Sequence, residues 1–192
     1  MSLRRLRAAD QRPRDRNLGT QTPQVGPGCD YTPGVLQPIA ADQAPVLQQL
    51  FELYCYDFSE QLRLPLRATG RFDIPVGDWW TREGHVPFFI QREDELVGFA
   101  LVRRGSHVTG ARDVMDVAEF FVVRGARRSG IGAEAARQLF ERFPGPWEIR
   151  VRESNASALA FWSRVVSAWN GAQALPEPFE RDGVAWRLLR VG

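Results

Sequence analysis

The chain has 192 residues, of which 44% are hydrophobic and 25% are charged, a composition typical of one globular domain with a full core. Its formal net charge of +2 does not indicate a protein that binds nucleic acid through charge. All 25 basic residues are arginine, so the chain offers no lysine for Schiff-base chemistry.

Cysteine content and hydropathy give the expected compartment. Two cysteines, Cys29 and Cys55, are too few for a disulfide framework, which fits a reducing environment. No apolar run reaches the roughly 18 residues that a membrane span needs, and the first residues lack the apolar stretch of a signal peptide. We therefore expect a cytoplasmic protein without a membrane partner.

Residues 1–34 differ in composition from the rest. They are rich in Pro, Gly and Gln, show little apolar periodicity, and carry six Arg against three Asp. Such a segment buries too little apolar surface to offset the entropy of ordering it. We predict a disordered N-terminal extension over 1–34 and a single domain over 35–192. A basic arm that contacts a partner is the alternative.

The first half of the domain is predicted to form a strand, a helix and a hairpin. Residues 35–41 have the composition of a short strand, and Asp42 is a candidate helix N-cap. The apolar residues of that helix recur at helical spacing, at Val46, Leu47, Leu50, Phe51, Tyr54 and Cys55. A poorly periodic segment follows, and two apolar runs at 86–91 and 95–104 then flank a polar turn.

The second half alternates strands and helices. Residues 112–123 have apolar side chains on both faces, which is typical of a central, buried strand. A helix over 130–143, a strand over 147–153, a helix over 155–169 and a strand over 183–191 follow. The side chains expected to point inward from the second helix are Leu159, Trp162, Val165, Val166 and Trp169. This order predicts a mixed α/β sheet with helices in its connections.

The segment VVRGARRSGIGAEAARQLF, Val122–Phe140, joins the central strand to a helix through a loop with glycines. The first turn of a helix presents free N–H groups and the positive end of its dipole, which attract phosphate. Glycine lets a ligand approach the backbone, and Arg124, Arg127 and Arg128 add positive charge. These features favour a phosphate-bearing ligand.

Two familiar phosphate-binding loops fit poorly. A Walker loop needs a lysine, which this chain lacks. Gly130, Gly132 and Ala135 have the G-x-G-x-x-A spacing of a dinucleotide-binding fold, with Glu153 at the end of the next strand. However, residues RGARRS separate these glycines from the preceding strand, and only 39 residues follow Glu153, too few to complete that fold.

The same residues resemble the GNAT superfamily of N-acetyltransferases. Residues 127–132 (RRSGIG) match its signature R/Q-x-x-G-x-G/A, residues 118–123 (AEFFVV) look like its fourth strand, and residues 155–162 (NASALAFW) look like its N-x-x-A-x-x-x-Y segment. The combination is similar to a bacterial branch of the superfamily. The resemblance implies a mixed, mostly antiparallel twisted sheet flanked by helices, one N-acetyltransferase domain over 35–192, and acetyl-CoA as co-substrate.

The resemblance also assigns residues to acetyl-CoA. In the family, the fourth strand pairs with the pantetheine arm, and one of its N–H groups stabilises the oxyanion formed during transfer. The residues of this chain that correspond to acetyl-CoA-binding positions are Phe121, Val122, Val123, Arg127, Arg128, Ser129, Gly130, Ile131, Gly132, Ala133, Asn155 and Trp162.

Glu119 is the candidate general base. An alkyl amine with a pKa near ~10.4 is neutral in only roughly one molecule in two thousand at pH 7, so its attack on a thioester benefits from a base. Regular strand alternation would place Glu119 on one face with Val117, Phe121 and Val123, and this apolar setting should raise its pKa. Many family members carry a glutamate in this strand for this role. The alternative is a structural carboxylate paired with an arginine.

Two residues of the family pattern have alternative interpretations. The family's tyrosine, which often protonates the departing thiolate, is replaced by Trp162, whose indole N–H donates a hydrogen bond but cannot give up its proton. Either another group serves as the acid, or the thiolate leaves without one. Asn155 keeps the family's asparagine, with a plain helix N-cap as the alternative.

The acceptor side is less specific. Tyr56, Asp57, Trp79 and Trp80 come from the segment with which the family binds its acceptor, and aromatic rings with one carboxylate suit a cationic amine. Ordinary core aromatics are the alternative. The two histidines have no partner at ligand spacing, so we expect no metal. We expect a small-molecule or peptide amine as acceptor, no nucleic-acid partner, and a monomer or homodimer.

Together these features predict an N-acetyltransferase that transfers the acetyl group of acetyl-CoA to a primary amine by direct attack. Two alternatives stay open. One is an acetyl-CoA-binding regulatory module with little turnover, which the missing tyrosine favours. The other is an acyltransferase that uses a longer acyl-CoA.

Overall fold

A computed structural model describes residues 35–192, which form a seven-stranded sheet with three α-helices. The strands are β1 (Leu36–Pro38), β2 (His85–Arg92), β3 (Glu95–Arg104), β4 (Met115–Val122), β5 (Trp147–Arg152), β6 (Glu177–Arg181) and β7 (Val184–Val191). The helices are α1 (Ala44–Leu62), α2 (Ile131–Arg142) and α3 (Ala156–Asn170).

The strands follow the order β1-β2-β3-β4-β5-β7-β6, and every neighbouring pair is antiparallel except β4 with β5. The predicted fold class, a mixed and mostly antiparallel sheet flanked by helices, is therefore confirmed. The predicted hairpin is β2–β3, and the predicted central strand is β4. The dinucleotide-binding alternative, which requires a mostly parallel sheet, is excluded by this topology.

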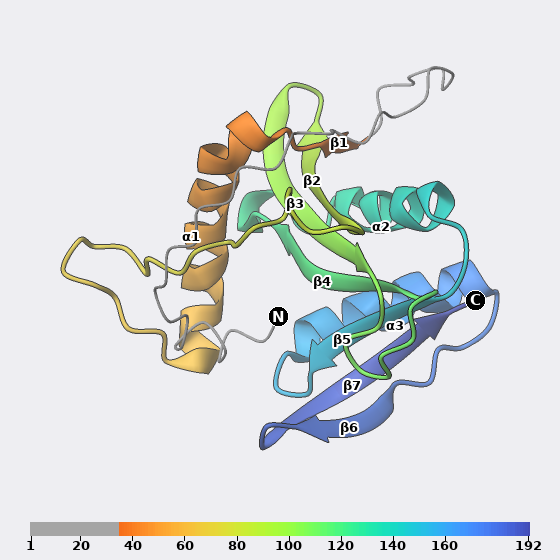
Figure 1. Cartoon of the computed structure of the whole chain (residues 1–192). Coiled ribbons are helices and arrows are strands. Elements are labelled where there is room, and N and C mark those ends of the chain that lie inside the picture. Colours follow the sequence, from red (N-terminus) through yellow and green to blue (C-terminus); the bar gives the residue numbers. More distant parts are fainter. Residues whose placement is uncertain (1–34) are drawn as a thin grey trace.

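The two faces of the sheet carry separate cores, with α1 on one side and α2 and α3 on the other (Figure 1). On the α1 side, buried residues of the helix such as Leu47 and Phe51 pack on Phe99 of β3 and Phe121 of β4. Asp42 lies in a 3₁₀ turn over Ala41–Gln43, and the N-cap of α1 is Gln43, so the predicted Asp42 cap is wrong.

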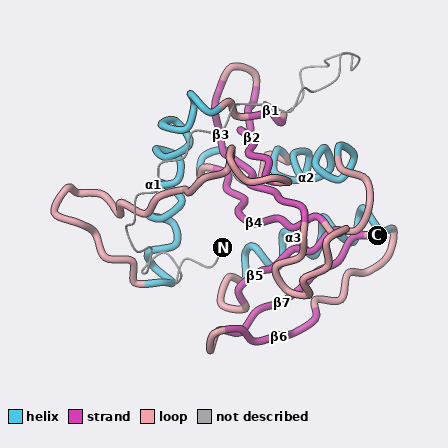
Figure 2. Tube along the Cα trace, in the orientation of Figure 1, coloured by secondary structure: helices cyan, strands magenta, loops and turns pink. Residues whose placement is uncertain are grey.

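The long connection from α1 to β2, residues 63–84, leaves the C-terminal end of the helix, loops out to its side and returns across it toward β2 (Figure 2). Two polar side chains of α1 attach it. Gln48 accepts the N–H of Val76 at 3.0 Å, and Glu52 accepts the N–H of Phe72 at 2.8 Å. The backbone of this connection is thus held by the helix even though it forms no regular structure of its own.

Two details differ from the prediction. Strand β6 is absent from the predicted order because it is a short edge strand that contains Pro178, a pattern that alternation alone detects poorly. Trp169, predicted to point inward, is 42% exposed and contacts Phe140 edge-on near the C-terminal end of α3. Residues 1–34 lie outside the described part of the chain, so their predicted disorder stays a prediction.

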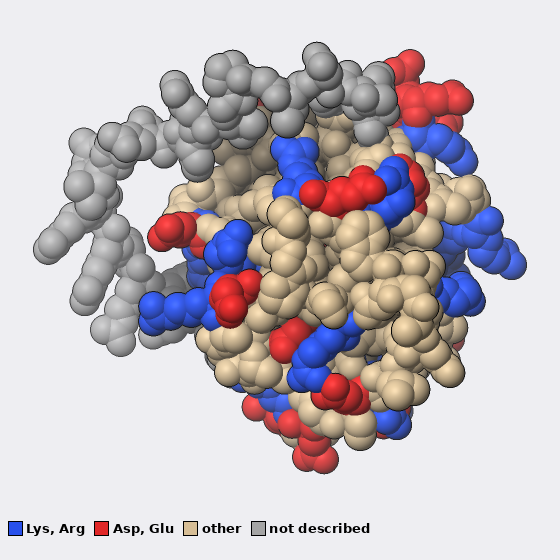
Figure 3. Space-filling model, turned by 90° about the vertical axis from the view of Figure 1, so that its right-hand side faces the viewer, with Lys and Arg blue, Asp and Glu red and all other residues tan. Residues whose placement is uncertain are grey.

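Charged side chains of both signs are interspersed on the face drawn in Figure 3. Exposed ion pairs also lie along α2, where Arg137 pairs with Glu134 and Glu141. Within residues 35–192, no helix combines the length and the apolar character needed to cross a membrane.

Close packing at the centre of the sheet gives a test of the β3–β4 register. A Cβ on Gly98 of β3 would lie 2.1 Å from the carbonyl oxygen of Phe121, so a side chain forces the two strands apart. We expect Gly98→Ala to lower the free energy of unfolding by about 2–3 kcal/mol, measured by chemical denaturation.

Gly125 is the matched control, because a Cβ there meets no atom within 4 Å. Gly125→Ala should change the free energy of unfolding by less than about 0.5 kcal/mol. Equal stability of the Gly98→Ala variant and the wild type would contradict the register.

Candidate active site

The loop between β4 and α2 presents a series of free backbone donors. Arg128 has a left-handed φ of 64°, and Gly130, the N-cap of α2, has a φ of 89°. Among the described residues, the N–H groups of 128–133 donate to no protein acceptor. Three of them belong to the first turn of α2, where an anion is stabilised by the helix dipole. The backbone of this loop therefore has the free donors that a phosphate group needs.

The three arginines of this loop differ in their contacts. Arg124 donates from Nε to Asp57 Oδ1 at 2.7 Å. Arg127 donates from Nη2 to Asp57 Oδ2 and from Nε to the carbonyl of Val122 at 2.7 Å. Arg128 has no hydrogen-bond or ion-pair partner in residues 35–192. Its guanidinium is thus the one left available for a ligand, although all three arginines were predicted to contribute charge.

Gly132 lies in the first turn of α2 against the neighbouring layer. A Cβ at this position would be 3.4 Å from the ring of Phe161 on α3 and 3.7 Å from Cγ2 of Val122 on β4. A Cβ would therefore meet these neighbours at ordinary contact distance, so packing alone does not require glycine here.

Strands β4 and β5 part within the sheet. They pair only from Met115 to Val117, opposite Trp147 to Ile149, although β4 continues to Val122. The N–H of Val123 donates to Val97 of β3 at 2.8 Å, so strand alternation directs the N–H of Val122 toward the unpaired edge. That edge is a gap in the sheet with free backbone groups.

Glu119 follows a one-residue bulge in β4. The β3–β4 register shifts here, which leaves Ala118 without a partner in β3. Because the extra residue reverses the alternation of side chains, Val117 packs in the core under α2 and α3 whereas Phe121 packs under α1. The prediction that Val117 shares a face with Glu119 is wrong, while the apolar setting on the α1 side remains.

The carboxylate of Glu119 is held by α1. Tyr54, which is buried, donates its hydroxyl to Glu119 Oε2. Burial raises the pKa of Glu119, and the Tyr54 hydrogen bond and the charges of Arg150 and Arg103 only partly oppose this. Burial and the charge of Glu119 raise the pKa of Tyr54 well above its usual value, so the hydroxyl stays a donor. No arginine of the described chain lies within ion-pair distance of Glu119.

The two positions with alternative interpretations are in α3 and at its N-cap. Trp162 is buried, and its ring meets Phe120 of β4 and Phe161 edge-on at centroid distances of 5.1 and 5.0 Å. Its indole N–H has no hydrogen-bond partner in the described residues. Asn155 is the N-cap of α3 and accepts the N–H of Ala158 at 3.1 Å. The capping interpretation of Asn155 is thus satisfied by the structure itself.

The four predicted acceptor residues are dispersed. Trp79 is buried and donates its indole N–H to Val76 at 2.9 Å, while Trp80 donates to Ile39 at 2.8 Å. Tyr56 is 66% exposed on α1, and the carboxylate of Asp57 is occupied by Arg124 and Arg127. No hydrogen bond, ion pair or ring contact within residues 35–192 joins one of the four to another.

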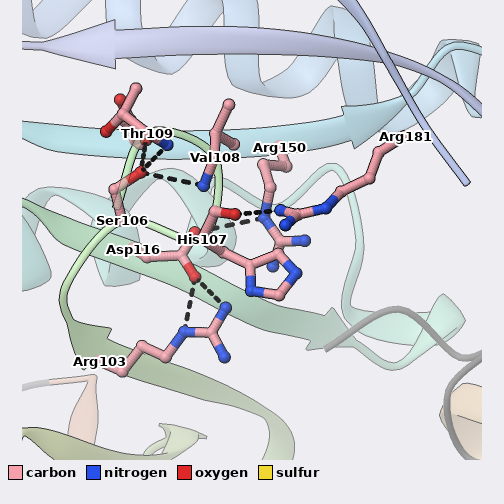
Figure 4. A network of polar contacts seen from close by, with 9 residues as sticks. Arg103, Ser106, His107, Val108, Thr109, Asp116, Arg150 and Arg181 are labelled. Atoms are coloured by element: carbon pink, nitrogen blue, oxygen red, sulfur yellow. Dashed lines mark hydrogen bonds and ion pairs between the residues drawn. The ribbon is translucent and has the colours of Figure 1, made fainter. Parts of the chain in front are cut away.

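A second polar cluster, which includes Asp116 of β4, was not predicted (Figure 4). Asp116 of β4 is fully buried, accepts Nε of Arg103 at 2.8 Å, and lies 3.4 Å from Nε of Arg150 on β5. A buried carboxylate in an apolar strand is visible in the sequence, but its partners depend on the sheet register.

The loop between β3 and β4 lies next to this cluster. Ser106 donates to Glu148 of β5, and Arg181 of β6 donates to the carbonyl of His107. Burial and the charges of Arg150 and Arg103 lower the pKa of His107 to about 3, so its imidazole is neutral near pH 7. In the described part of the chain, no three His, Cys, Asp or Glu residues gather as metal ligands would.

Comparison with known proteins agrees with this geometry. The sequence model described as the acetyltransferase (GNAT) family matches residues 47–166. The sequence matches none of the curated proteins with which it was compared. Similar solved structures include an acetyltransferase from Thermus thermophilus (TM-score 0.58, 16% identity, 81% of this chain and 94% of that one) and an N-acetyltransferase from Staphylococcus aureus (0.59, 12%, 81% and 99%).

A third similar structure is a ribosomal-protein-alanine N-acetyltransferase from Brucella melitensis, with a TM-score of 0.51 at 18% identity over 81% of this chain and 97% of that one. At such identities the structural likeness concerns the fold. The family match itself covers well over half of the chain. With its parted strands and its signature loop, the chain belongs to the GNAT acetyltransferase family.

Proposed function

We propose that this protein transfers the acetyl group of acetyl-CoA to a primary amine by direct attack, with Glu119 as the general base. One observation carries the proposal. Glu119 combines a raised pKa with a fixed orientation, and it lies on β4 just past the last residue that pairs with β5. A base at this place can accept a proton from an amine while the acetyl donor occupies the gap between the strands.

The residues of the loop and gap fit a CoA thioester. The free N–H groups of 128–133 and the guanidinium of Arg128 would bind its pyrophosphate, and the open edge of β4 would pair with its pantetheine arm. Acetyl-CoA supplies the thioester whose carbonyl carbon the amine attacks. The N–H of Val122, directed to the unpaired edge, is the donor best placed to stabilise the oxyanion.

Glu119 would take the proton through one oxygen. Its Oε2 is engaged by Tyr54, so Oε1 is the oxygen left for the amine proton. The raised pKa strengthens the carboxylate as a base near neutral pH, and the hydroxyl of Tyr54 prevents the side chain from rotating away. Tyr54 is therefore a positioning residue in this proposal rather than a proton donor.

Trp162 favours a thiolate that leaves without an acid. It fills the space of the family's tyrosine, and its N–H is a hydrogen-bond donor that keeps its proton. A thiol with an ordinary pKa of about 8.5 is a tolerable leaving group near pH 8 without protonation. The same observation supports the second candidate function, an acetyl-CoA-binding module with little turnover.

Two measurements on the full chain separate these candidates. Native mass spectrometry of protein purified without added ligand should show a co-purified CoA species. Release of free CoA should depend on an added amine, with acetyl-CoA used faster than longer acyl-CoA thioesters. Tight CoA binding without amine-dependent release across a panel of small and peptide amines would establish the binding module instead.

Arg128 gives a test of the cofactor site. A charge-assisted hydrogen bond to phosphate contributes about 1.5–3 kcal/mol, so Arg128→Gln should weaken CoA binding about tenfold or more, by calorimetry. The loss should shrink as ionic strength rises, because exposed charges are screened. Arg137→Gln on the outer face of α2 is the control and should leave CoA affinity unchanged. Equal affinity of the Arg128→Gln variant at low salt would contradict this assignment.

Tyr54 and Glu119 give a test of the base through its pH dependence. Tyr54 donates to the ionised carboxylate, so Tyr54→Phe should raise the pKa of Glu119 further. A base works when ionised, so the acid limb of the kcat/KM profile should move to higher pH in Tyr54→Phe. Glu119→Gln should lose roughly 10²–10⁴-fold in turnover below the amine pKa and recover as pH rises. A uniform loss at every pH in both variants would indicate a structural role only.

A further inference from the structure

The balance of charge beside Glu119 is uneven. Arg103 and Arg150 approach the single carboxylate of Asp116 from β3 and β5, and the three side chains are 14%, 5% and 0% exposed (Figure 4). Glu119 is too far from either arginine to form an ion pair. Two mostly enclosed arginine side chains therefore share one carboxylate, which leaves one positive charge without a direct partner.

The guanidinium of Arg150 has unused donors. Only its Nε lies near an acceptor, 3.4 Å from Asp116 Oδ1, and its Nη groups have no hydrogen-bond partner in residues 35–192. Its central carbon lies 5.7 Å from the ring centroid of Trp186 on β7. These Nη atoms are not among the fully buried, unpaired side-chain atoms of the described chain, so they are accessible to a ligand, and an unused guanidinium fork in a polar cluster calls for an explanation.

The place of Arg150 in the sheet accounts for its unused donors, because they lie beside the gap between β4 and β5. It follows Ile149, which forms the last pair of β5 with β4, so the register places it across the gap at the level of Ala118, the residue before Glu119. Its positive charge lowers the pKa of Glu119, against the larger opposing effect of burial. The neighbouring His107 is neutral, and Glu148 is engaged by Ser106 and Arg190, so neither neutralises Arg150.

From these contacts, and resting on the function proposed above, we infer that the acceptor is an amine that also carries an anionic group, a carboxylate or a phosphate, which Arg150 binds while Glu119 receives the amine proton. A guanidinium fork binds either anion through paired N–H donors. A purely cationic amine is instead repelled by Arg150. This reverses the charge of acceptor that Tyr56, Asp57, Trp79 and Trp80 suggested from the sequence.

The reaction balances with this arrangement. The amine nitrogen forms a bond to the acetyl carbon, and the carbon–sulfur bond of the thioester breaks. One amine proton passes to Glu119, and the electron pair of the broken bond leaves with CoA as thiolate. The anionic group on the acceptor takes no part in these steps, so Arg150 determines specificity and is not required to move a proton.

Matched amines test the inference. In each pair one member carries an anionic group that the other lacks: glycine with glycinamide, β-alanine with β-alaninamide, and aminomethylphosphonate with methylamine. We expect Arg150→Gln to lower kcat/KM for the anionic member at least about tenfold more than for its neutral partner. The ratio of variant to wild type is compared for each amine, because the members of a pair differ in amine pKa. The carboxylate and phosphonate series show which anion is preferred.

Two further variants keep the test decisive. Arg150→Lys retains the charge and should retain part of the preference, even if Arg150→Gln is less stable to denaturant. Arg187 is the control, since it lies beside Val151 on the opposite face of the same strands and pairs with Glu153 in solvent. Arg187→Gln should leave both members of each pair unchanged. The inference would be overturned if Arg150→Gln lowered kcat/KM equally for both members of a pair. It would also be overturned if the wild type used the neutral member faster and Arg150→Gln left the ratio of the two kcat/KM values unchanged.

A binding measurement separates this inference from the proposed function. N-acetylglycine and N-acetylglycinamide are titrated into the protein with CoA present, by calorimetry. If the wild type binds the anionic product selectively and Arg150→Gln does not, the inference is supported, whether or not any amine is turned over. If in that case no amine is turned over, only the proposed catalysis is contradicted. Turnover of neutral amines with no preferred binding of the anionic product leaves the catalysis intact and overturns the inference.

Discussion

The parting of β4 from β5 is the constraint on which the site depends. A parallel pair joined over three residues stays fixed at one end, while the other end opens and leaves backbone donors and acceptors of β4 unpaired. Everything that the proposal uses lies around that opening: the glycine loop at the end of β4, Glu119 on one side of the gap, and Arg150 on the other. The helices pack on both faces of these strands, at Val117 within the paired segment and at Phe121 and Val122 beyond it.

Local patterns revealed those parts of the protein that depend on neighbours in sequence. Each of these patterns spans a short segment of sequence. They are the glycines and arginines of residues 127–132, the apolar strand that contains Glu119, and the helical spacing of α1. The helix ends were predicted less well, since Asp42 proved to lie in a turn rather than at the cap. The edge strand β6 left too weak a pattern to detect.

Contacts across the sheet could not be read in this way. Tyr54 and Glu119 are 65 positions apart, and Asp116 and Arg150 are 34 apart. Their meeting depends on the register of three strands and on the side of the sheet that α1 covers. The single unpaired residue Ala118 was also invisible, because a bulge has no strong sequence signature in a strand that is apolar on both faces.

The bulge at Ala118 reverses which side chains of β4 point to each face of the sheet. Before Ala118, the odd-numbered residues Met115 and Val117 face α2 and α3; after it, the even-numbered Val122 does so. Asp116 and Glu119 are three positions apart, and they point to the same side of the sheet only because Ala118 between them has no partner in β3. Deletion of one residue here would point the side chain of Glu119 toward the core under α2 and α3. The long connection 63–84 forms no strand, so a change in its length moves no side chain to another face of the sheet. Insertions and deletions should thus accumulate in that connection during divergence and be excluded from β4, independently of which amino acids change.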